Sequence, residues 1–260
     1  MTSQIVFLVG ILAIGFFSCS GRHSTFYKNK VIAHRGAWKA QKHPQNSLAS
    51  LQEAIDLKCE GSEFDVWMTA DGVLVANHDA DHAGMMIEQV TYKQLLTEPL
   101  PNGENIPTAE AYLKKGMSQD KTKLIFEIKP SGINKKRGLE IAEKSVELVR
   151  SLKAEQWVDY ITFDYDIGLK VIELDSSANV AYLTGDRSPE ILKKEGFFGF
   201  DYNIKTVREN PQWINEAQDL GLTVNVWTVN KKEDMEWLLS QDVDFITTDE
   251  PELLFQLINP

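Results

Sequence analysis

The chain has 260 residues, of which 27 are Lys or Arg and 38 are Asp or Glu, so its formal net charge is −11 at pH 7. Its 43% hydrophobic and 25% charged residues are typical of a globular protein, which excludes whole-chain disorder. The acidic balance argues against a nucleic-acid partner, because nucleic-acid binding requires a basic surface. The length fits one large α/β domain or two small ones.

The N-terminus is a separate segment. Residues 5–17 are apolar or glycine without interruption, a run that is shorter than the roughly 20 residues of a membrane-spanning helix and is typical of a secretory signal. Ser18-Cys19 follows, and a small residue before Cys is similar to a bacterial lipoprotein processing site. Because no Lys or Arg precedes the run, a short uncleaved anchor is the alternative.

We therefore predict a signal peptide over residues 1–18 and a tether over 19–29, with Cys19 lipidated. The expected location is the bacterial envelope, either the periplasm or the outer membrane. There the lipid would anchor the exported protein to a membrane. Cys59 is the other cysteine, so no internal disulfide is expected, and its helical context predicts a buried thiol.

After Lys30, short runs rich in β-branched or aromatic residues alternate with helical patterns. The expected strands are Val31–His34, Ser62–Met68, Leu124–Lys129, Tyr160–Phe163, Val180–Leu183, Gly199–Tyr202, Thr223–Thr228 and Asp244–Thr247. The clearest helical stretches are Leu48–Leu57, Leu139–Lys153, Asp166–Leu174, Ser188–Lys194, Pro211–Leu220 and Lys231–Gln241. This count predicts a TIM (β/α)8 barrel over residues 30–260. A doubly wound open sheet is the alternative, although no G-x-G-x-x-G follows the first strand.

One further strand falls outside this alternation. Val73–Asn77 follows the pair Asp71-Gly72, and Asp-Gly between two extended runs is a hairpin signal. The second strand should therefore extend past the barrel rim and fold back, which carries His78 over the C-terminal mouth. A small insertion with short helices near residues 92–96 and 108–115 is expected to follow this hairpin.

Charged residues interrupt the apolar strands near their C-terminal ends, where barrels of this type carry active sites. They are His34, Arg35, Glu63, Asp65, His78, Glu127 and Lys129. Residues two apart on a strand share a face, so three carboxylates should converge and require a neutralising cation. All-oxygen ligands favour Ca2+ or Mg2+. A structural cluster of salt bridges with Arg35 and Lys129 is the alternative.

Two histidines accompany this acidic cluster. His34 and His78 suit proton transfer near neutral pH, and Arg35 suits bidentate contact with phosphate oxygens. The other histidines lie in the tether or in polar loops and are expected at the surface: His23, His43 and His82. A hard cation with Arg, Lys and two histidines describes a site that attacks a phosphate ester.

In their order and spacing, these segments resemble the glycerophosphodiester phosphodiesterases. The resemblance is carried by Ile32–Gly36, Glu63–Val66, Asp71–Val75 leading to His78-Asp79, Phe126–Lys129, Val226–Asn230 and Ile246–Asp249. It implies a TIM barrel with a hairpin or small insertion after the second strand. It also implies a phosphoric diester hydrolase that releases sn-glycerol 3-phosphate and an alcohol from a small-molecule glycerophosphodiester.

The same resemblance assigns roles to individual residues. It gives the divalent cation, Ca2+ or Mg2+, to Glu63, Asp65 and Glu127, acid–base catalysis to His34 and His78, and phosphoryl binding to Arg35 and Lys129. Trp227 would wall the pocket, and the alcohol would lie near Asp201, Tyr202 and Asn203. Which histidine is the acid stays open, as does the nucleophile, which is either water or a glycerol hydroxyl through a cyclic phosphate.

One position departs from the family pattern, which usually has Glu-Asn-Thr where this chain has Gln45-Asn46-Ser47. Asn46 and Ser47 keep residue types that cap helices, whereas Gln45 lacks the charge. Metal affinity and head-group preference can therefore differ from the typical member.

Two alternative functions are a lipid phosphodiesterase of the phospholipase D or sphingomyelinase type, and a lipoprotein that binds phosphodiesters without cleaving them.

Overall fold

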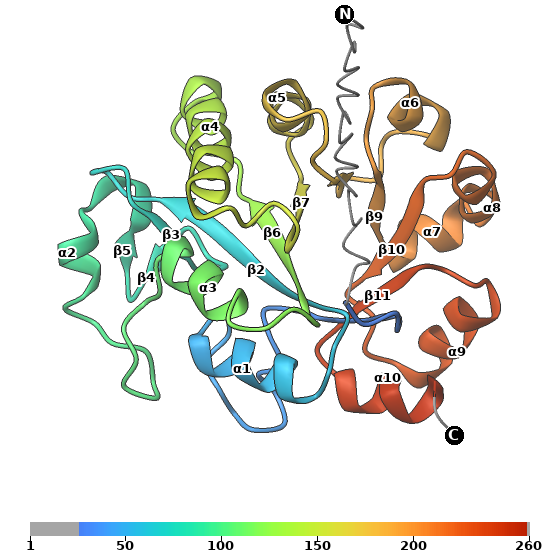
Figure 1. The fold of residues 1–260 in the computed structure, drawn as a ribbon, viewed down its shortest axis with the longest axis horizontal. Helices are drawn as coiled ribbons and strands as arrows, with labels where there is room; N and C mark the ends of the chain where they lie inside the picture. Colours follow the sequence, from blue (N-terminus) through green and yellow to red (C-terminus); the bar gives the residue numbers. More distant parts are fainter. Residues whose placement is uncertain (1–25, 259–260) are drawn as a thin grey trace, which may run out of the picture.

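Eight parallel strands close into a barrel in the computed structural model, which describes residues 26–258 (Figure 1). The barrel strands are β1 (Val31–Ala33), β2 (Gly61–Met68), β6 (Lys123–Ile128), β7 (Val158–Thr162), β8 (Val180–Tyr182), β9 (Gly199–Asn203), β10 (Thr223–Trp227) and β11 (Phe245–Thr248). Because β1 pairs with both β11 and β2, the sheet has no open edge between them. This closure confirms the predicted TIM barrel and excludes the open doubly wound sheet.

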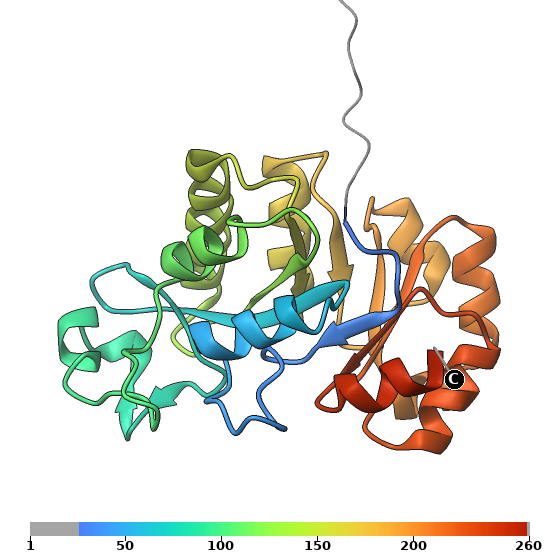
Figure 2. The same ribbon diagram turned by 60° about the horizontal axis from the view of Figure 1, so that its bottom comes forward.

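Helices lie outside the barrel strands, as Figures 1 and 2 show from two directions. They are α1 (Leu48–Asp56), α4 (Lys135–Leu152), α5 (Tyr165–Leu174), α6 (Pro189–Lys194), α7 (Ile204–Glu209), α8 (Gln212–Asp219), α9 (Lys232–Ser240) and α10 (Pro251–Ile258). The expected helices are present, with ends shifted by at most a few residues. The sequence analysis did not assign α7 and α10, both of which begin directly after a strand or a short turn. No helix within residues 26–258 is long and apolar enough to cross a membrane.

The main core fills the layer between the strands and the helices. Alternation along β2 sends Phe64 and Val66 into this layer, where Phe64 stacks on Tyr112 at 4.1 Å and meets Phe126 at 4.8 Å between ring centroids. The same alternation turns Glu63 and Asp65 to the inside of the barrel. The apolar outer face of each strand thus fixes the orientation of the charged inner residues.

The predicted hairpin is present after β2. Strand β3 (Leu74–Ala76) pairs antiparallel with β2, with Val75 opposite Trp67. The insertion continues through β4 (Asp81–His82), β5 (Met85–Met86), a 3-10 turn (Ile87–Gln89), α2 (Tyr92–Leu95) and α3 (Ala109–Gly116). Its own small core is formed by Trp67, Val75, Ile87, Leu95 and Ile106.

One histidine does not lie where the sequence predicted. His82 is buried, and its Nε2 lies 2.6 Å from the carbonyl oxygen of Glu98, because the β4–β5 hairpin lies against the segment that follows α2. Cys59 is buried, as expected. The predicted signal peptide, Cys19 and most of the predicted tether lie outside the described residues.

The first described residues pack against the amino-terminal end of the barrel. The Phe26 ring meets Trp157 edge-on at 6.3 Å between centroids, and the backbone N–H of Tyr27 donates to the carbonyl oxygen of Lys121 at 2.8 Å. Asn29 donates its backbone N–H to Glu60, which precedes β2. The chain therefore enters the barrel at the end opposite to its C-terminal mouth.

A close approach of two barrel strands gives a test of this architecture. A Cβ at Gly199 would lie 2.2 Å from the carbonyl oxygen of Thr223, which belongs to the neighbouring strand and cannot move without breaking the sheet. We expect Gly199→Ala to lower the free energy of unfolding by about 1–3 kcal/mol, the usual cost of overpacking. Urea denaturation measures this change.

Gly132 provides the control, since a Cβ there would meet a Glu88 side-chain oxygen at an ordinary 3.5 Å. Gly132→Ala should change the free energy of unfolding by less than about 0.5 kcal/mol. Equal effects of the two substitutions would contradict the close approach of β9 and β10 at Gly199.

Candidate active site

A pocket of about 550 Å³, including its open mouth, lies at the C-terminal ends of the barrel strands. It is lined by His34, Arg35, Glu63, Asp65, His78, Glu127, Lys129, Ile161, Phe163, Leu183, Asp201, Trp227, Thr228 and Thr247. The charged residues come mainly from β1, β2, β6 and the end of the hairpin, and the apolar ones from β7, β8 and β10. The pocket therefore has a charged half and an apolar half.

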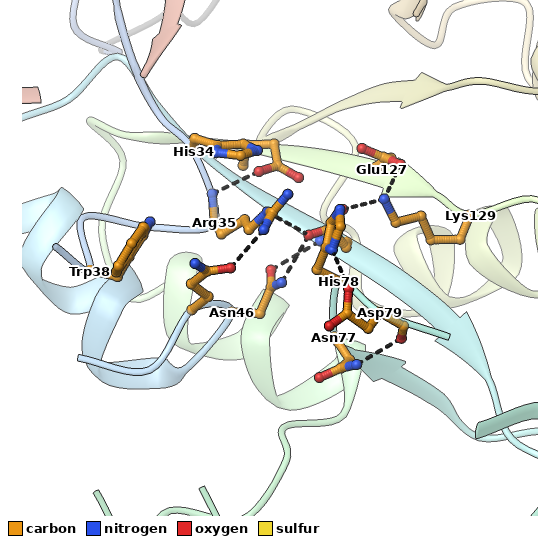
Figure 3. A network of polar contacts seen from close by, with 12 residues as sticks. His34, Arg35, Trp38, Asn46, Asn77, His78, Asp79, Glu127 and Lys129 are labelled. Atoms are coloured by element: carbon orange, nitrogen blue, oxygen red, sulfur yellow. Dashed lines mark hydrogen bonds and ion pairs between the residues drawn. The ribbon is translucent and has the colours of Figure 1, made fainter. Parts of the chain in front are cut away.

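Three carboxylates converge in the charged half. Glu63 and Asp65 lie on β2, and Glu127 faces Asp65 in the register of β6; one oxygen of each lies within 4.8 Å of the others. Lys129 Nζ lies 2.6 Å from both Asp65 Oδ1 and Glu127 Oε1 (Figure 3). Glu63 Oε1 is buried, with no hydrogen-bond partner among the described residues. This donor set fits a hard divalent cation.

The electrostatics of the cluster favour the same ligand. Burial, together with the charges of Asp65 and Glu127, raises the pKa of Glu63 well above its ordinary value. Burial and Asp65 likewise raise the pKa of Glu127 to about 7. Burial alone would also raise the pKa of Asp65, but Lys129 and His78 outweigh it and lower that pKa. The mutual repulsion of these carboxylates therefore favours a bound proton or a bound cation over the fully charged cluster.

His34 is held by a partly buried chain of polar contacts. Its Nδ1 lies 2.7 Å from Asp249 Oδ1, which leaves Nε2 as the free ring nitrogen. Asp249 also accepts hydrogen bonds from Trp38 Nε1 at 3.3 Å and from Asn230 Nδ2 at 2.7 Å. Burial would raise the pKa of Asp249, but the hydrogen bond and charge of His34 outweigh it and lower that pKa. Asp249 thus orients His34, a role that the sequence analysis did not assign.

His78 has a different environment. Its Nδ1 lies 2.7 Å from Asp79 Oδ1, and its carbonyl oxygen accepts a hydrogen bond from Trp67 Nε1 at 3.1 Å. Burial lowers the pKa of His78 below its ordinary value; Asp65 opposes this shift, and Lys129 supports it. Both histidines therefore have Nδ1 engaged by a carboxylate, and both line the same pocket.

The loop after β1 positions Arg35 in an uncommon backbone conformation. Its φ is +56°, and its backbone N–H donates to Glu63 Oε2 at 2.7 Å. Its Nη1 donates to Gln45 Oε1 at 2.7 Å, and its Nε lies 3.6 Å from Asp65 Oδ2. Gly36 follows with φ +78°, and a Cβ there would lie 2.6 Å from the backbone of Ser50. The close packing against α1 therefore fixes this loop.

Asn46 has a role other than the predicted capping. Ser47 alone caps α1, by accepting a hydrogen bond from the backbone of Ser50 at 3.0 Å. Asn46 is buried with φ +58°, and its Nδ2 donates to Asp65 Oδ2 at 2.9 Å. Its Oδ1 accepts from the Asp65 backbone at 3.1 Å. Asn46 therefore orients one carboxylate of the cluster.

Trp227 is one of the residues that line the pocket. It packs edge-on against Phe163 at 5.4 Å between ring centroids, and its Nε1 donates to the carbonyl oxygen of Asp201 at 2.8 Å. Sequence reasoning missed the other apolar wall residues: Ile161, Phe163 and Leu183. In the sequence these residues cannot be distinguished from other apolar residues of a strand. Only the closed barrel reveals that they face the site.

Two of the three residues proposed at the end of β9 lie away from the pocket. Tyr202 points into the helix layer, where it stacks on Phe200 at 4.5 Å and donates its hydroxyl to the carbonyl oxygen of Arg187. Asn203 caps α7 by accepting a hydrogen bond from the backbone of Lys205. Strand alternation explains the orientation of Tyr202, since Asp201 faces inward and its neighbour faces outward. Asn203 would share the inward face of Asp201 by alternation, but its side chain is engaged in the cap of α7 instead.

The comparisons with known proteins agree with this geometry. The family model for the glycerophosphoryl diester phosphodiesterases matches residues 34–253. A glycerophosphodiester phosphodiesterase of Caldanaerobacter subterraneus subsp. tengcongensis is 29% identical over 248 residues, 89% of this chain and 98% of the relative. The crystal structure of a glycerophosphodiester phosphodiesterase from Parabacteroides distasonis is 42% identical, with a TM-score of 0.86 over 90% of this chain and 98% of that one.

A more distant structure shares the fold. It is an Oleispira antarctica phosphodiesterase in complex with the product sn-glycerol 3-phosphate, 23% identical, with a TM-score of 0.75 over 89% of this chain and 97% of that one. The family match covers most of the described barrel and every residue that lines the pocket, from His34 to Thr247. The chain therefore belongs to the glycerophosphoryl diester phosphodiesterase family and is a phosphoric diester hydrolase that acts on glycerophosphodiesters.

Proposed function

We propose that this pocket releases sn-glycerol 3-phosphate and an alcohol by histidine acid–base catalysis beside a divalent cation. The observation that carries the proposal is the convergence of two histidines, each with Nδ1 held by a carboxylate, on one pocket with three clustered carboxylates. The product bound by the Oleispira antarctica phosphodiesterase, sn-glycerol 3-phosphate, supports the substrate class.

Glu63, Asp65 and Glu127 are the proposed ligands of Ca2+ or Mg2+. When bound, such a cation polarises a phosphoryl oxygen and stabilises the negative charge that develops in the transition state. Arg35 and Lys129 supply further positive charge at the same oxygens. Lys129 already lies between two of the carboxylates, so it can hold the cluster together and reach the phosphate beside it.

His34 and His78 then carry the protons. One imidazole takes the proton from the nucleophile, and the other gives a proton to the departing alkoxide. Because Asp249 and Asp79 engage each Nδ1, the Nε2 atoms are the groups that exchange these protons. The same arrangement serves an attacking water or the neighbouring glycerol hydroxyl.

Turnover of glycerophosphodiesters tests this assignment. The full chain should release glycerol 3-phosphate from glycerophosphocholine, glycerophosphoethanolamine or glycerophosphoglycerol, and His34→Ala and His78→Ala should each lower kcat by about 10²-fold or more. An enzyme-coupled assay for glycerol 3-phosphate measures both. His43→Ala, which changes a histidine whose side chain does not line the pocket, is the control and should keep its turnover. Near-normal turnover in both active-site variants would falsify the acid–base roles.

Cation binding should strengthen as the pH rises. The carboxyl of Glu127, with its pKa raised to about 7, is protonated below that pH and competes with the metal; Glu63, also raised, adds to the effect. Calorimetric titration with Ca2+ or Mg2+ should show about tenfold or more tighter binding at pH 8 than at pH 6. EDTA should abolish turnover at either pH.

Glu127→Gln should bind the cation more weakly at pH 8 and with less dependence on pH, because one titrating ligand is gone. Glu155→Gln, which changes an exposed carboxyl, should titrate like the unmodified chain. Binding that is equally tight at pH 6 and pH 8 in the unmodified chain contradicts the proposed ligand set.

We also propose that the chain is an exported lipoprotein acylated at Cys19. Phe26 is seven residues after Cys19, so the intervening chain can span at most about 25 Å. Phe26 packs at the amino-terminal end of the barrel, opposite to the pocket. This placement turns the mouth away from the anchoring membrane, which favours water-soluble glycerophosphodiesters over lipids of that same membrane.

Cell fractionation tests the anchor. Cys19→Ala should move the protein from the membrane fraction to the soluble fraction and leave its kcat for glycerophosphocholine unchanged, since the site lies on the opposite end of the barrel. Cys59→Ala is the matched cysteine control and should remain in the membrane fraction. A Cys19→Ala protein that stays with the membrane refutes lipid anchoring at this residue.

A further inference from the structure

Asp201 is a buried carboxyl that the proposed chemistry does not use. It lies on β9, which is four strands from β2 in either direction around the barrel and therefore faces the metal-binding carboxylates across the interior. The residue is 1% exposed, and it lines both the active-site pocket and a smaller cavity inside the barrel. Its Oδ1 has no hydrogen-bond partner among the described residues.

The neighbouring protein groups leave this oxygen free for a ligand. Asn225, paired with Asp201 in the register of β10, lies close enough for its side chain to hydrogen-bond to the Asp201 carboxyl, which opposes the rise in the pKa of that carboxyl. Asn225 also donates its Nδ2 to Thr247 Oγ1 at 2.9 Å and accepts from the backbone of Val226 at 2.8 Å, and Oδ1 of Asp201 stays without a partner among the described residues. The Trp227 indole is bonded to the carbonyl oxygen of Asp201, so the backbone beside the carboxyl is fixed. A buried carboxyl oxygen without a hydrogen-bond partner costs free energy, which a ligand that hydrogen-bonds to it would offset.

The chemistry of the site narrows the ligand to a hydroxyl group. Burial and the nearby Glu127 raise the pKa of Asp201 well above its ordinary value, which disfavours a charge there. An anionic phosphate is better served by Arg35 and Lys129 in the opposite half of the pocket. A carboxyl, whether protonated or not, bonds well to an alcohol hydroxyl, and the walls beside it are apolar: Ile161, Leu183 and Trp227.

We infer that Asp201 determines substrate specificity by hydrogen bonding to the terminal hydroxyl of the glycerol moiety. The inference rests on the proposed function and adds to it the recognition of the part that every glycerophosphodiester shares. Glycerol fits the enclosed floor, because its hydroxyl can satisfy Oδ1 while its carbons contact the apolar wall. The departing alcohol, which varies in size, needs the open side, where Phe163 is 36% exposed.

A pair of substrates isolates this contact. Glycerophosphocholine is compared with the analogue in which 1,2-propanediol replaces glycerol, so that the hydroxyl next to the phosphate ester is kept and the terminal one is lost. The unmodified chain should prefer glycerophosphocholine by about 10²-fold or more in kcat/KM, because the analogue leaves a buried polar group unpaired. This ratio, rather than the rate itself, is the readout.

Substitutions at Asp201 should change the ratio. Asp201→Leu should reduce the preference to within about threefold, and Asp201→Asn, which keeps a hydrogen-bonding group, should retain at least about tenfold. Asp201→Ala serves if the larger leucine prevents folding, with the same expectation. Thr223→Val, which changes a hydroxyl of the inner cavity outside the active-site pocket, should keep the original ratio.

Thermal denaturation separates recognition from stability. Removal of a buried carboxyl with one unpaired oxygen should leave the melting temperature of Asp201→Leu equal to or above that of the unmodified chain, while its substrate preference is lost. A preference that survives in Asp201→Leu or Asp201→Ala overturns the inference. Equal hydrolysis of both substrates by the unmodified chain also overturns it but leaves the phosphodiesterase activity standing, whereas hydrolysis of neither overturns the proposed function itself.

Discussion

The convergence of Glu63, Asp65 and Glu127 inside a closed barrel is the constraint on which the rest of the site depends. Three carboxylates within 4.8 Å of one another cannot share a dry interior without compensating positive charge. Lys129 supplies part of that charge, and the raised pKa values of Glu63 and Glu127 indicate that more is required. A divalent cation meets this demand and also serves the proposed phosphodiester chemistry, so the feature that destabilises the fold is the one that the proposed mechanism uses.

Backbone conformations around the cluster are explained by the same demand. Arg35 and Asn46 both adopt positive φ, which is unfavourable for residues other than glycine. In return, the Arg35 backbone N–H reaches Glu63, and both polar ends of the Asn46 amide reach Asp65. Two carboxylates of the trio are thereby fixed before any ligand binds. The sequence alone cannot reveal this, because neither residue type forbids an ordinary conformation.

The sequence predicted the barrel and the charged half of the pocket, because both leave local patterns. Eight strand runs set the topology, and charges such as Glu63 and Glu127 inside apolar strands are too costly to lack a purpose. The partners of the proposed catalytic groups were missed because they depend on tertiary contacts. Asp249 is 215 positions from His34, and only barrel closure through β1 and β11 brings them together. The end of β9 was misjudged for a related reason: three consecutive residues cannot all face one pocket.

Gln45 shows how one neutral residue alters the balance of this site. Its Oε1 accepts a hydrogen bond from Arg35 at 2.7 Å, which is the contact that a glutamate would make as an ion pair. The amide keeps the guanidinium in place without neutralising it, so more of its charge remains for the phosphodiester anion. Compared with a glutamate at position 45, Gln45 places one negative charge fewer beside the nearby carboxylates. Their deprotonation is therefore easier, and deprotonated carboxylates are the form that binds a cation. In the proposed mechanism, a residue that is conservative in shape thus leaves more positive charge for the substrate, while the proposed metal-binding trio and both histidines stay unchanged.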